Sequence, residues 1–411
     1  MNIDPLFVLG SVVWFTIIIL FLAVFIAYAG KKLAPAGSVT IDINDGKKKL
    51  EVAPGSTLLS VLAGKNIFLP SARGGGGTCA MCKSIVLEGG GTILPTETGQ
   101  ISKADQKKGM RLSCQVKVGQ NMKIHVHDEV LEIKKFEGTV RSNNNVATFI
   151  KEFIVDLPPG VDLNFRAGGY IQIDIPPYEI DFAKNIEVPE KYREDWDKFK
   201  IFDLKAKYTG EKFTAYSMAN HPAEGNCVML NVRIATPPPK LMGQVPPGVA
   251  STYIFSKKPG DKVWISGPFG EFFAKETKRE MCFVGGGAGM APMRSHIFDL
   301  FHTKKTDRKV TFWYGARSVR EMFYDDDFKS IEDKCPNFKY HVALSDALPT
   351  DNWSGYKGFI HNVLLKEYLD KHDDPTNIEY YLCGPPPMLN ALKKMLYDIG
   401  VETNMIAYDE F

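Results

Sequence analysis

The chain has 411 residues, of which 44% are hydrophobic and 24% charged, a composition typical of a folded protein with several domains. Its 50 Lys and Arg residues against 48 Asp and Glu give a formal net charge of +2, so no excess of positive charge favours nucleic acid as a partner. Seven cysteines are too few for a disulfide scaffold, and an odd number cannot all pair. These values exclude disordered, fibrous and disulfide-rich classes.

The first predicted element is an apolar helix near the N-terminus. From Leu6 to Ala29 no residue carries a charge, and at about 1.5 Å per residue such a helix is roughly 36 Å long, enough to cross a membrane core of about 30 Å. An Ala-x-Ala sequence at 27–29 resembles a signal-peptide cleavage site, but the run is preceded by Asp4 and is longer than a signal core, which favours an uncleaved anchor. Lys31 and Lys32 follow directly. The positive-inside rule therefore places everything after residue 30 in the cytoplasm of a bacterial cell, beneath its inner membrane.

The rest of the chain divides into three predicted domains after a tail at 1–5, a transmembrane helix at 6–29 and a linker at 30–37. Residues 38–130 alternate short strands with helical stretches and glycine turns, which predicts an α+β domain. Residues 131–276 contain short β segments broken by Gly and Pro, typical of an antiparallel barrel or sandwich. Residues 277–411 repeat strand, glycine turn and helix, which predicts a parallel sheet with crossover helices. The predicted strands are 39–43, 48–52, 83–87, 122–126, 170–175, 228–234, 262–265, 281–284, 310–314 and 380–383.

An insertion rich in charged and aromatic residues interrupts the predicted barrel at 178–210, after Pro176 and Pro177. Two interpretations stay open. The segment is either a solvated excursion or a surface on which a partner docks.

A glycine run followed by two cysteines lies in the first domain. Cys79 and Cys82 are three residues apart behind Gly74 to Gly77, and Cys114 follows later in the chain. Thiolates bind iron, and glycines let the backbone wrap closely so that N–H groups reach the sulfurs, which favours an iron-sulfur cluster. A chance CxxC pair and a zinc site are the alternatives, with His125 and His127 as further zinc ligands on the strand beyond Cys114.

This motif resembles the plant-type 2Fe-2S ferredoxins, with one departure. The family has a cysteine before the glycine run, and this sequence has Arg73. The resemblance therefore implies Cys79, Cys82 and Cys114 as metal ligands and leaves the fourth position without a thiolate, because a guanidinium offers no lone pair. A damaged allele, a sequencing error and a genuine variant with an altered cluster all stay open.

A second motif, Thr214-Ala215-Tyr216-Ser217, lies on a predicted barrel strand. It resembles the R-x-Y-S signature of the ferredoxin-NADP reductase superfamily, which implies that Tyr216 and Ser217 contact FAD. Thr214 stands where the family has an arginine on the flavin pyrophosphate, and Lys212, on the same strand face, supplies part of the missing charge. Gly248, Ser251 and Thr252 belong to a turn at a helix start, where N–H groups and hydroxyls meet phosphate oxygens.

A third motif is the loop Gly285, Gly286, Gly287 and Gly289, which follows a predicted strand and opens a helix, the context of a phosphate-binding loop. In the same superfamily, the segments that contain Arg317 and Ser318, and Cys383, Gly384 and Pro385, line the nicotinamide nucleotide. The resemblance implies that Cys383 lies near the nicotinamide ring, and a small buried residue is the alternative. Phe411, the last residue, is expected to stack on the flavin ring or to be a frayed tail.

The order of these modules resembles one family across essentially all 411 residues, the F subunits of the bacterial sodium-translocating NADH:quinone oxidoreductases. Its specific marks include residues 165–172, 189–199, 231–238, 285–296 and 314–323. The resemblance implies that NADH donates hydride to FAD, and that single electrons leave through a 2Fe-2S cluster toward membrane partner proteins that reduce quinone and export Na⁺. The alternatives are the reductase component of a multicomponent oxygenase, and a tethered flavoprotein assembly subunit whose electron exit is impaired by Arg73.

Overall fold

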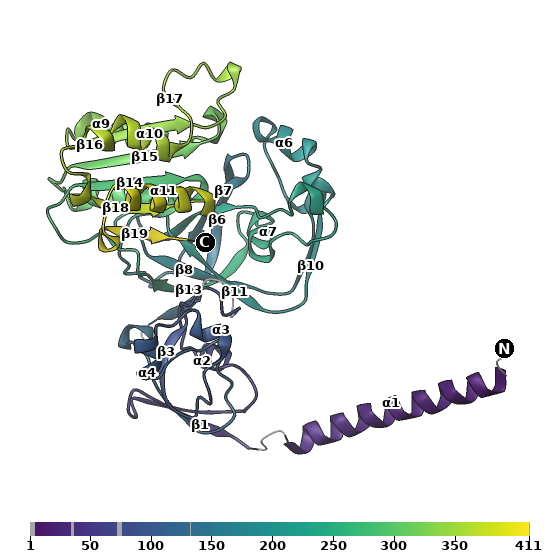
Figure 1. Ribbon diagram of the computed structural model, residues 1–411. Coiled ribbons are helices and arrows are strands. Elements are labelled where there is room, and N and C mark those ends of the chain that lie inside the picture. Colours follow the sequence, from purple (N-terminus) through teal and green to yellow (C-terminus); the bar gives the residue numbers. More distant parts are fainter. Residues whose placement is uncertain (1–4, 34–36, 72–75, 132, 411) are drawn as a thin grey trace. The chain divides into compact units, whose positions relative to one another are not determined.

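The computed structural model describes residues 5–33, 37–71, 76–131 and 133–410 (Figure 1). The chain forms two compact units, one made of residues 1–70 and 75–132 and the other of residues 71–74 and 133–411. Helix α1 spans Pro5–Leu33, and its side chains from Val12 to Phe25 are exposed. Within the described residues, no helix meets the combined length and apolarity required of a membrane span. The predicted linker lies partly in α1 and partly at 34–36, outside the described residues.

The first unit carries a five-stranded mixed sheet in the order β2-β1-β5-β3-β4. Strand β1 pairs antiparallel with β2 and parallel with β5, so the chain must cross over between β1 and β5. Helix α2 lies within this connection and buries Leu58, Leu59 and Leu62. The α+β prediction is confirmed. The elements are β1 Val39–Ile43, β2 Lys48–Val52, α2 Leu58–Ala63, β3 Lys83–Glu88, α3 Pro95–Thr98, α4 Lys103–Lys107, β4 Met110–Leu112 and β5 Met122–His125.

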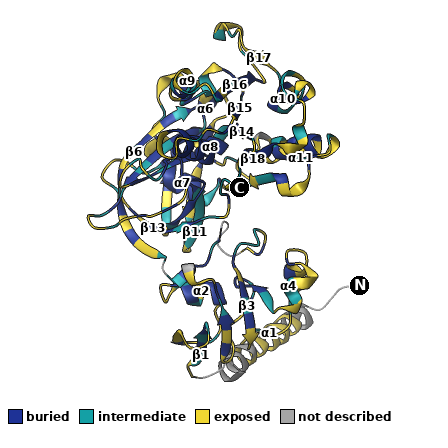
Figure 2. Ribbon diagram, turned by 90° about the vertical axis from the view of Figure 1, so that its left-hand side faces the viewer, coloured by how far each residue is buried: buried dark blue, intermediate teal, exposed yellow. Residues whose placement is uncertain are grey.

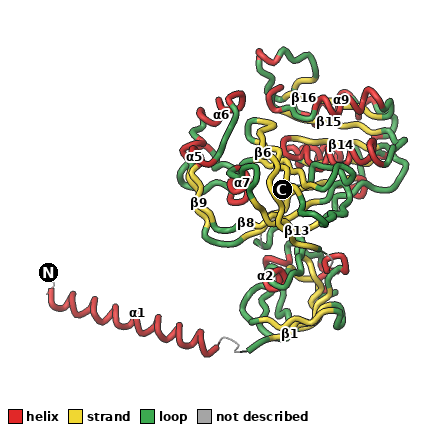
Figure 3. Tube along the Cα trace, turned by 180° about the vertical axis from the view of Figure 1, so that it is seen from behind, coloured by secondary structure: helices red, strands yellow, loops and turns green. Residues whose placement is uncertain are grey.

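The second unit begins with an antiparallel six-stranded sheet in the order β11-β8-β13-β6-β7-β12. An antiparallel bridge between Met218, just after β11, and Leu230, in the middle of β12, joins the two outer strands, so the sheet curls toward a barrel (Figure 3). The antiparallel prediction is confirmed. The elements are β6 Lys134–Ala147, β7 Ile150–Asp156, β8 Tyr170–Ile175, β11 Lys212–Ser217, β12 Cys227–Arg233, α7 Val249–Phe255 and β13 Lys262–Phe269.

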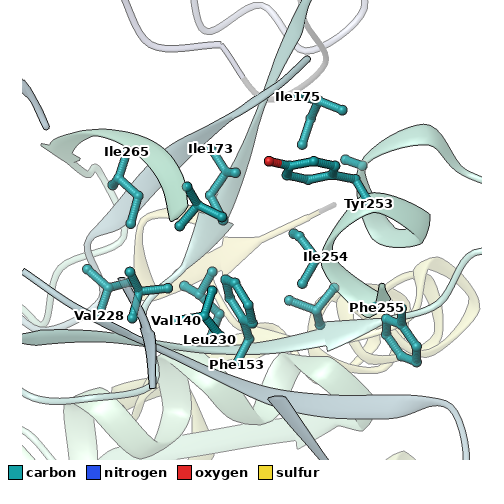
Figure 4. Packing of buried hydrophobic residues seen from close by; sticks show 14 of the residues in the cluster. Val140, Phe153, Ile173, Ile175, Val228, Leu230, Tyr253, Ile254, Phe255 and Ile265 are labelled. Carbon is teal, nitrogen blue, oxygen red and sulfur yellow. The ribbon is translucent and has the colours of Figure 1, made fainter. Parts of the chain in front are cut away.

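The barrel core consists of alternating strand residues and one face of α7. Figure 4 shows Phe153, Ile173, Leu230 and Ile254 pointing into the same interior, and each of them is fully buried. Burying aliphatic and aromatic side chains in this way contributes about 1.5–3 kcal/mol each. The core therefore fixes the strands that carry the predicted flavin residues.

The insertion at 178–210 packs on this barrel. Its ends form an antiparallel pair, β9 Tyr178–Asp181 and β10 Lys205–Tyr208, and it carries α5 Phe182–Asn185 and α6 Arg193–Lys198. The Trp196 side chain is fully buried in the barrel core. The centre of the insertion is therefore structural, so the interpretation of a solvated excursion is wrong for this part.

The last part of the unit is a parallel six-stranded sheet in the order β17-β16-β15-β14-β18-β19. Alternate residues of β14 face opposite sides: Phe283 packs in the cluster with α8 and α9, whereas Val284 packs in the cluster with α10 and α11. Figure 2 colours β14 and α8 as buried. The predicted parallel sheet with crossover helices is confirmed. The elements are β14 Met281–Gly286, α8 Met290–Phe298, β15 Val310–Ala316, α9 Asp325–Lys334, β16 Phe338–Leu344, β17 Tyr356–Lys357, α10 Ile360–Glu367, β18 Glu379–Cys383, α11 Pro386–Asp398 and β19 Ile406–Asp409.

Candidate functional site

The cysteine loop of the first unit brings two of its thiols together. Cys82 precedes β3 and Cys114 follows β4, and the Ser113 N–H donates to the Cys82 carbonyl at 2.8 Å, so the antiparallel pairing sets the two cysteines side by side. Both are buried. Their thiols share a hydrogen bond that raises the pKa of Cys82 and lowers the pKa of Cys114 to about 6.

The third cysteine, Cys79, is half-buried in the same loop. Among the described residues, no group of three or more His, Cys, Asp and Glu side chains is placed to hold one metal ion. A 2Fe-2S cluster divides its four ligands between two irons, so it needs pairs of thiolates rather than one compact group. The Gln115 amide also donates to the Cys114 sulfur at 3.5 Å. The Cys82 and Cys114 pair fits one iron, and Arg73 lies outside the described residues.

A buried ion pair supports strand β4 next to Cys114. Arg111 Nε and Nη2 donate to Glu97 Oε1 and Oε2 at 2.9 and 2.8 Å, and the Leu112 N–H donates to Glu97 Oε1 at 2.9 Å. Burial raises the pKa of Glu97, but these hydrogen bonds outweigh it and the net pKa is lowered. Glu97 therefore stays ionised at neutral pH.

The predicted flavin strand is β11. Lys212, Thr214 and Tyr216 alternate along it and share one face, and residues 212–216 are all half-buried. Burial raises the pKa of Tyr216, so its phenol stays protonated and able to donate. The Thr214 hydroxyl is buried and, within the described part of the chain, has no hydrogen-bond partner. An orphaned hydroxyl on this half-open face fits a bound polar group, as FAD would supply.

Ser217 faces the opposite side of β11 and contacts the end of the chain. Its Oγ donates to Asp409 Oδ2 at 2.6 Å, and Asp409 pairs with Cys383 between β19 and β18. Burial raises the pKa of Asp409. Ser217 is therefore positioned by a carboxylate of the nucleotide-binding half.

The turn before α7 holds Gly248, Ser251 and Thr252 close to the barrel. A Cβ on Gly248 would lie 2.6 Å from the Ala235 Cβ, so only glycine fits there. Ser251 Oγ accepts from the Ala235 N–H at 3.1 Å and donates to the Gly248 carbonyl at 3.2 Å. The Ser251 hydroxyl therefore holds the turn itself, and phosphate contact by these three residues stays a prediction.

A cavity of about 420 Å³ opens at the carboxyl ends of the parallel strands. In parallel sheets ligands bind at this edge, where the strand order reverses, and here β14 lies between β15 and β18. The volume falls within the range of about 300–1,000 Å³ for small-molecule sites. The lining residues include Gly286, Gly287, Tyr314, Arg317, Glu321, Ser345, Phe359, His361, Pro385 and Met388, with Phe149, Ile150 and Arg233 from the barrel.

The glycines of the loop after β14 have different tasks. A Cβ on Gly289 would lie 2.2 Å from the Cys383 carbonyl oxygen, so Gly289 lets α8 pack against the end of β18. Gly287 has a φ of +57° and opens toward the cavity, where a Cβ would meet only Ile150 Cδ1 at 4.0 Å. Gly286 faces the Met388 sulfur, and Gly285 faces core side chains. Gly287 therefore leaves room for a ligand to approach the backbone.

Arg317 lines the cavity, whereas Ser318 is buried behind it. The Arg317 Nη2 lies 4.0 Å from Asp195 Oδ2, and the neighbouring Arg320 binds the same carboxylate at 3.2 Å. Asp195 belongs to the insertion, so one carboxylate of the insertion holds the arginines at the rim of the cavity.

The tip of the β6–β7 hairpin completes this wall. The Thr148 N–H donates to Glu321 Oε2 at 3.1 Å, the Thr148 hydroxyl donates to Glu321 Oε1, and the Thr148 carbonyl accepts from Trp196 Nε1 at 2.7 Å. Three segments distant in sequence therefore shape one side of the cavity.

The segment after β18 contributes Pro385 to the lining, and a Cβ on Gly384 would lie 2.4 Å from Met388 Cε and 3.1 Å from the Gly286 carbonyl oxygen. Cys383 is fully buried among core residues, and burial raises the pKa of its thiol well above its usual value. This placement suits a small buried residue, and a role beside nicotinamide stays a prediction. Phe411 lies outside the described residues.

Several residues at the site are not predicted as site residues from the sequence. Arg233, Phe359 and His361 line the cavity, and the Phe359 side chain is 64% exposed with its ring stacked on His361 at 5.9 Å. An exposed aromatic ring at a cavity mouth is suited to stack on a planar base. Asp409 is not predicted as one either, because its partner Ser217 lies far away in sequence.

The folds and sites together define a modular flavin-dependent reductase, with a ferredoxin-type 2Fe-2S domain, a flavin barrel and a nicotinamide nucleotide domain. The family described as "2Fe-2S iron-sulfur cluster binding domain" matches residues 41–119, and "Oxidoreductase NAD-binding domain" matches residues 283–394. The F subunit of the Na(+)-translocating NADH-quinone reductase of Methylococcus capsulatus is 56% identical over 98% of both chains, and that of Klebsiella pneumoniae is 55% identical over 98% of both. The chain belongs to the family of these F subunits.

Solved structures share the fold at lower identity. The Amycolatopsis cytochrome P450 reductase GcoB superposes with a TM-score of 0.62 at 21% identity, covering 91% of this chain and 98% of that one. The ferredoxin reductase of carbazole 1,9a-dioxygenase gives a TM-score of 0.58 at 22% identity, with the same coverage. These similarities concern the fold alone.

Proposed function

We propose that this chain is the electron-input subunit of a membrane-bound, Na⁺-translocating NADH:quinone oxidoreductase. It takes hydride from NADH onto FAD and passes single electrons through a 2Fe-2S cluster to partner subunits and quinone. The observation that carries the proposal is the nucleotide cavity, whose wall is shared by the parallel sheet and the flavin barrel. Membership in the family of F subunits supports the same reaction.

FAD supplies, when bound, the conversion of a two-electron hydride donor into one-electron transfers, and the cluster supplies a one-electron relay. The chain supplies binding and orientation. Arg317 offers a cation to the nucleotide, and Gly287 admits its phosphates to the backbone. Tyr216 keeps a proton to donate, and Asp409 orients Ser217.

Within this scheme Cys79, Cys82 and Cys114 hold the cluster, and position 73 decides whether the cluster is complete. Hydride transfer needs only the flavin and nucleotide halves, which belong to one unit, whereas Cys79, Cys82 and Cys114 belong to the other. With Arg73 in the fourth ligand position, we expect NADH oxidation by an artificial acceptor to survive while electron exit to quinone is impaired.

The test compares NADH:ferricyanide activity with quinone reduction in the reconstituted complex, for the unaltered chain, Arg73→Cys and Arg73→Ser. Only Arg73→Cys should raise quinone reduction, because Arg73→Ser removes the charge without adding a thiolate. Iron and FAD counts with EPR of the reduced protein accompany the rates. A full rhombic 2Fe-2S signal with full quinone reduction in the unaltered chain would contradict the role given to position 73. Loss of ferricyanide activity in every variant would contradict the proposed reaction itself.

We propose further that α1 anchors the chain by a single pass in the bacterial inner membrane, with the domains after residue 30 in the cytoplasm. Two observations support an anchor: the uncharged run at 6–29, and the exposed apolar side chains of α1, where Trp14 and Phe21 are 68% and 69% exposed. The membrane proteins that accept electrons are then its partners. The domain boundaries at 38–130, 131–276 and 277–411 belong to the same proposal.

Protease treatment of inverted membrane vesicles tests this placement. A tag at the C-terminus should be cleaved in inverted vesicles and protected in intact spheroplasts, and deletion of residues 1–33 should release the protein from membranes. A tag protected in inverted vesicles would reverse the proposed orientation.

A further inference from the structure

A second cavity, of about 430 Å³, lies on the barrel away from the nucleotide site and shares no lining residue with it. Its walls come from the end of β6, the start of β7, the segment after α7 and the insertion. The lining residues are Asn143, Asn144, Asn145, Lys151, Asn185, Glu187, Val188, Pro189, Phe255, Lys257, Lys258 and Pro259. Apart from Val188, Pro189, Phe255 and Pro259, its lining is polar, and its charged residues are mostly basic.

The central cation of this cavity is Lys151, which is 3% exposed. Its Nζ reaches the Phe255 carbonyl at 3.5 Å and lies 5.4 Å from the Phe255 ring. Among the described residues, no carboxylate forms an ion pair with it. A buried ammonium with one long hydrogen bond retains donors that a ligand can use.

The surrounding charges are net positive. Among the described residues that line the cavity, Glu187 is the one carboxylate, and it is already paired with Lys258 at 2.8 Å. Lys257 adds a further cation above the Tyr253 ring. Burial lowers the pKa of Lys151 to about 8. Glu187 raises this pKa and Lys258 lowers it, each by less than burial does. The ammonium is therefore charged at neutral pH and gains from an added anion.

The cavity also holds acceptors. Asn145 is the cross-strand neighbour of Lys151, and Asn143 lies two residues before it on the same strand. The Asn143 Nδ2 group donates to the Ile254 carbonyl at 2.7 Å, and the Asn145 Nδ2 group donates to the Ala147 carbonyl at 3.2 Å. Within the described part of the chain, the two Oδ1 atoms are buried and have no partner. Each such acceptor needs a donor.

We propose that this cavity binds a phosphate group, free or carried by a small phosphate monoester. The anionic oxygens accept from Lys151 and Lys257, and the single hydroxyl of a monoprotonated phosphate, or of a monoester in its monoanionic form, donates to the carboxamide oxygen of Asn143 or Asn145. Sulfate has the same shape and charge type but carries no proton at neutral pH, so it satisfies the lysines only. The cavity is large enough for more than a bare phosphate, which is why a monoester is included.

The test is titration calorimetry on the full-length, FAD-loaded protein with saturating NAD⁺, which blocks the nucleotide cavity. The probes are inorganic phosphate, glycerol 3-phosphate and sulfate. Saturable binding of phosphate or glycerol 3-phosphate is expected. Inorganic phosphate, which keeps a proton at neutral pH, should bind at least about tenfold tighter than sulfate, since one charge-neutral hydrogen bond more or less changes affinity by about that factor. Tighter binding of the ester than of phosphate would assign the monoester as the ligand, and the reverse order would assign the free ion.

Three variants separate a site from nonspecific anion binding. Lys151→Met should weaken phosphate binding at least about tenfold, and Asn145→Asp should do the same because its carboxylate neutralises Lys151 and repels the anion. Lys334→Met, an exposed lysine on α9, is the matched control and should bind as the unaltered chain does. Thermal unfolding of each variant confirms that it is folded.

The pH dependence gives an independent readout. Because the pKa of Lys151 is about 8, raising the pH from 7 to 9 removes the charge from most of the molecules and should weaken binding about tenfold in the unaltered chain, but not in Lys151→Met. No saturable binding, equal affinity in Lys151→Met, or equal affinity for sulfate and phosphate would each overturn the proposal.

Discussion

Replacing Gly289 by alanine tests whether the nucleotide loop depends on a backbone-to-backbone contact. The added Cβ would lie 2.2 Å from the Cys383 carbonyl oxygen, 2.4 Å from its carbonyl carbon and 2.7 Å from the Gly384 nitrogen. All three atoms belong to the backbone of β18 and the segment after it, so no side chain can rotate away. Helix α8 and the end of β18 must instead separate.

The size of this effect follows from the distances. Ordinary contact begins near 3.4 Å, so the two elements must move by roughly 1 Å, and overpacking of this kind costs about 1–3 kcal/mol. Both elements adjoin the nucleotide cavity, and a misplacement of about 1 Å in a binding site can reduce the rate about 100-fold. We therefore expect a lower thermal midpoint and a KM for NADH raised about 10- to 100-fold.

The assay is NADH:ferricyanide reduction by the FAD-loaded chain, with thermal unfolding followed by circular dichroism. Gly285→Ala is the matched control, because its Cβ would meet the side chains of Met293 and Phe312 at 3.1 and 3.2 Å, which can shift by a few tenths of an ångström. The control should change KM less than about threefold. A Gly289→Ala protein with unaltered midpoint and KM would refute the contact as the reason for glycine at this position.

Three further predictions concern buried polar groups. Arg111→Met should destabilise the first unit by about 3–5 kcal/mol, because it leaves the fully buried Glu97 carboxylate without its cation. Hydrogen exchange of the β4 amides measures this loss. A double variant that also carries Glu97→Leu should recover most of it, and failure to recover would contradict this explanation. Burial raises the pKa of Glu224, but Arg294 holds this pKa below its usual value. The stabilisation by ionised Glu224 is therefore present above about pH 4.3 and is lost as the pH falls further. Glu224→Gln should flatten the acidic part of a plot of the urea unfolding midpoint against pH, and parallel curves for the two proteins would contradict this explanation. Trp196→Phe should lower stability by about 1–3 kcal/mol and raise the KM for NADH, because the Thr148 carbonyl beside the nucleotide cavity loses its short hydrogen bond and keeps the long one from Asn145, at 3.5 Å. An unchanged KM would separate the insertion from the cavity.

The parts of the fold that follow from local pattern are predictable. The strand Tyr170–Ile175 has the predicted bounds because its β-branched residues are bordered by a glycine pair and a proline pair. Strand β14 runs two residues longer than predicted, through Gly285 and Gly286, since parallel pairing with β15 continues to the loop. The glycine loop itself is recognisable because a strand, glycines and a helix follow one another directly.

Other parts depend on contacts that local pattern does not reveal. Strand β6 carries three consecutive asparagines, residues of low β-propensity, and it is held by pairing with β7 and β13 rather than by its own preference. The sequence pattern predicts no strand near the C-terminus, yet β19 pairs in parallel with β18. The sites of Asp409 and Arg233 result from these tertiary contacts.

The insertion illustrates why composition alone misleads about a surface segment. Its charges favour solvent exposure, yet two of its side chains point inward. Asp195 forms an ion pair with Arg320 of the nucleotide domain, and Trp196 donates a hydrogen bond to the Thr148 carbonyl of the barrel. A buried carboxylate between arginines is stable only when those arginines stay in place, so Asp195 and the cavity rim fix each other. A reductase without this insertion would have to close the same wall with other residues. The insertion is therefore part of the nucleotide site as well as an exposed surface, and a partner that docks on its outer face would contact an element whose inner face shapes NADH binding.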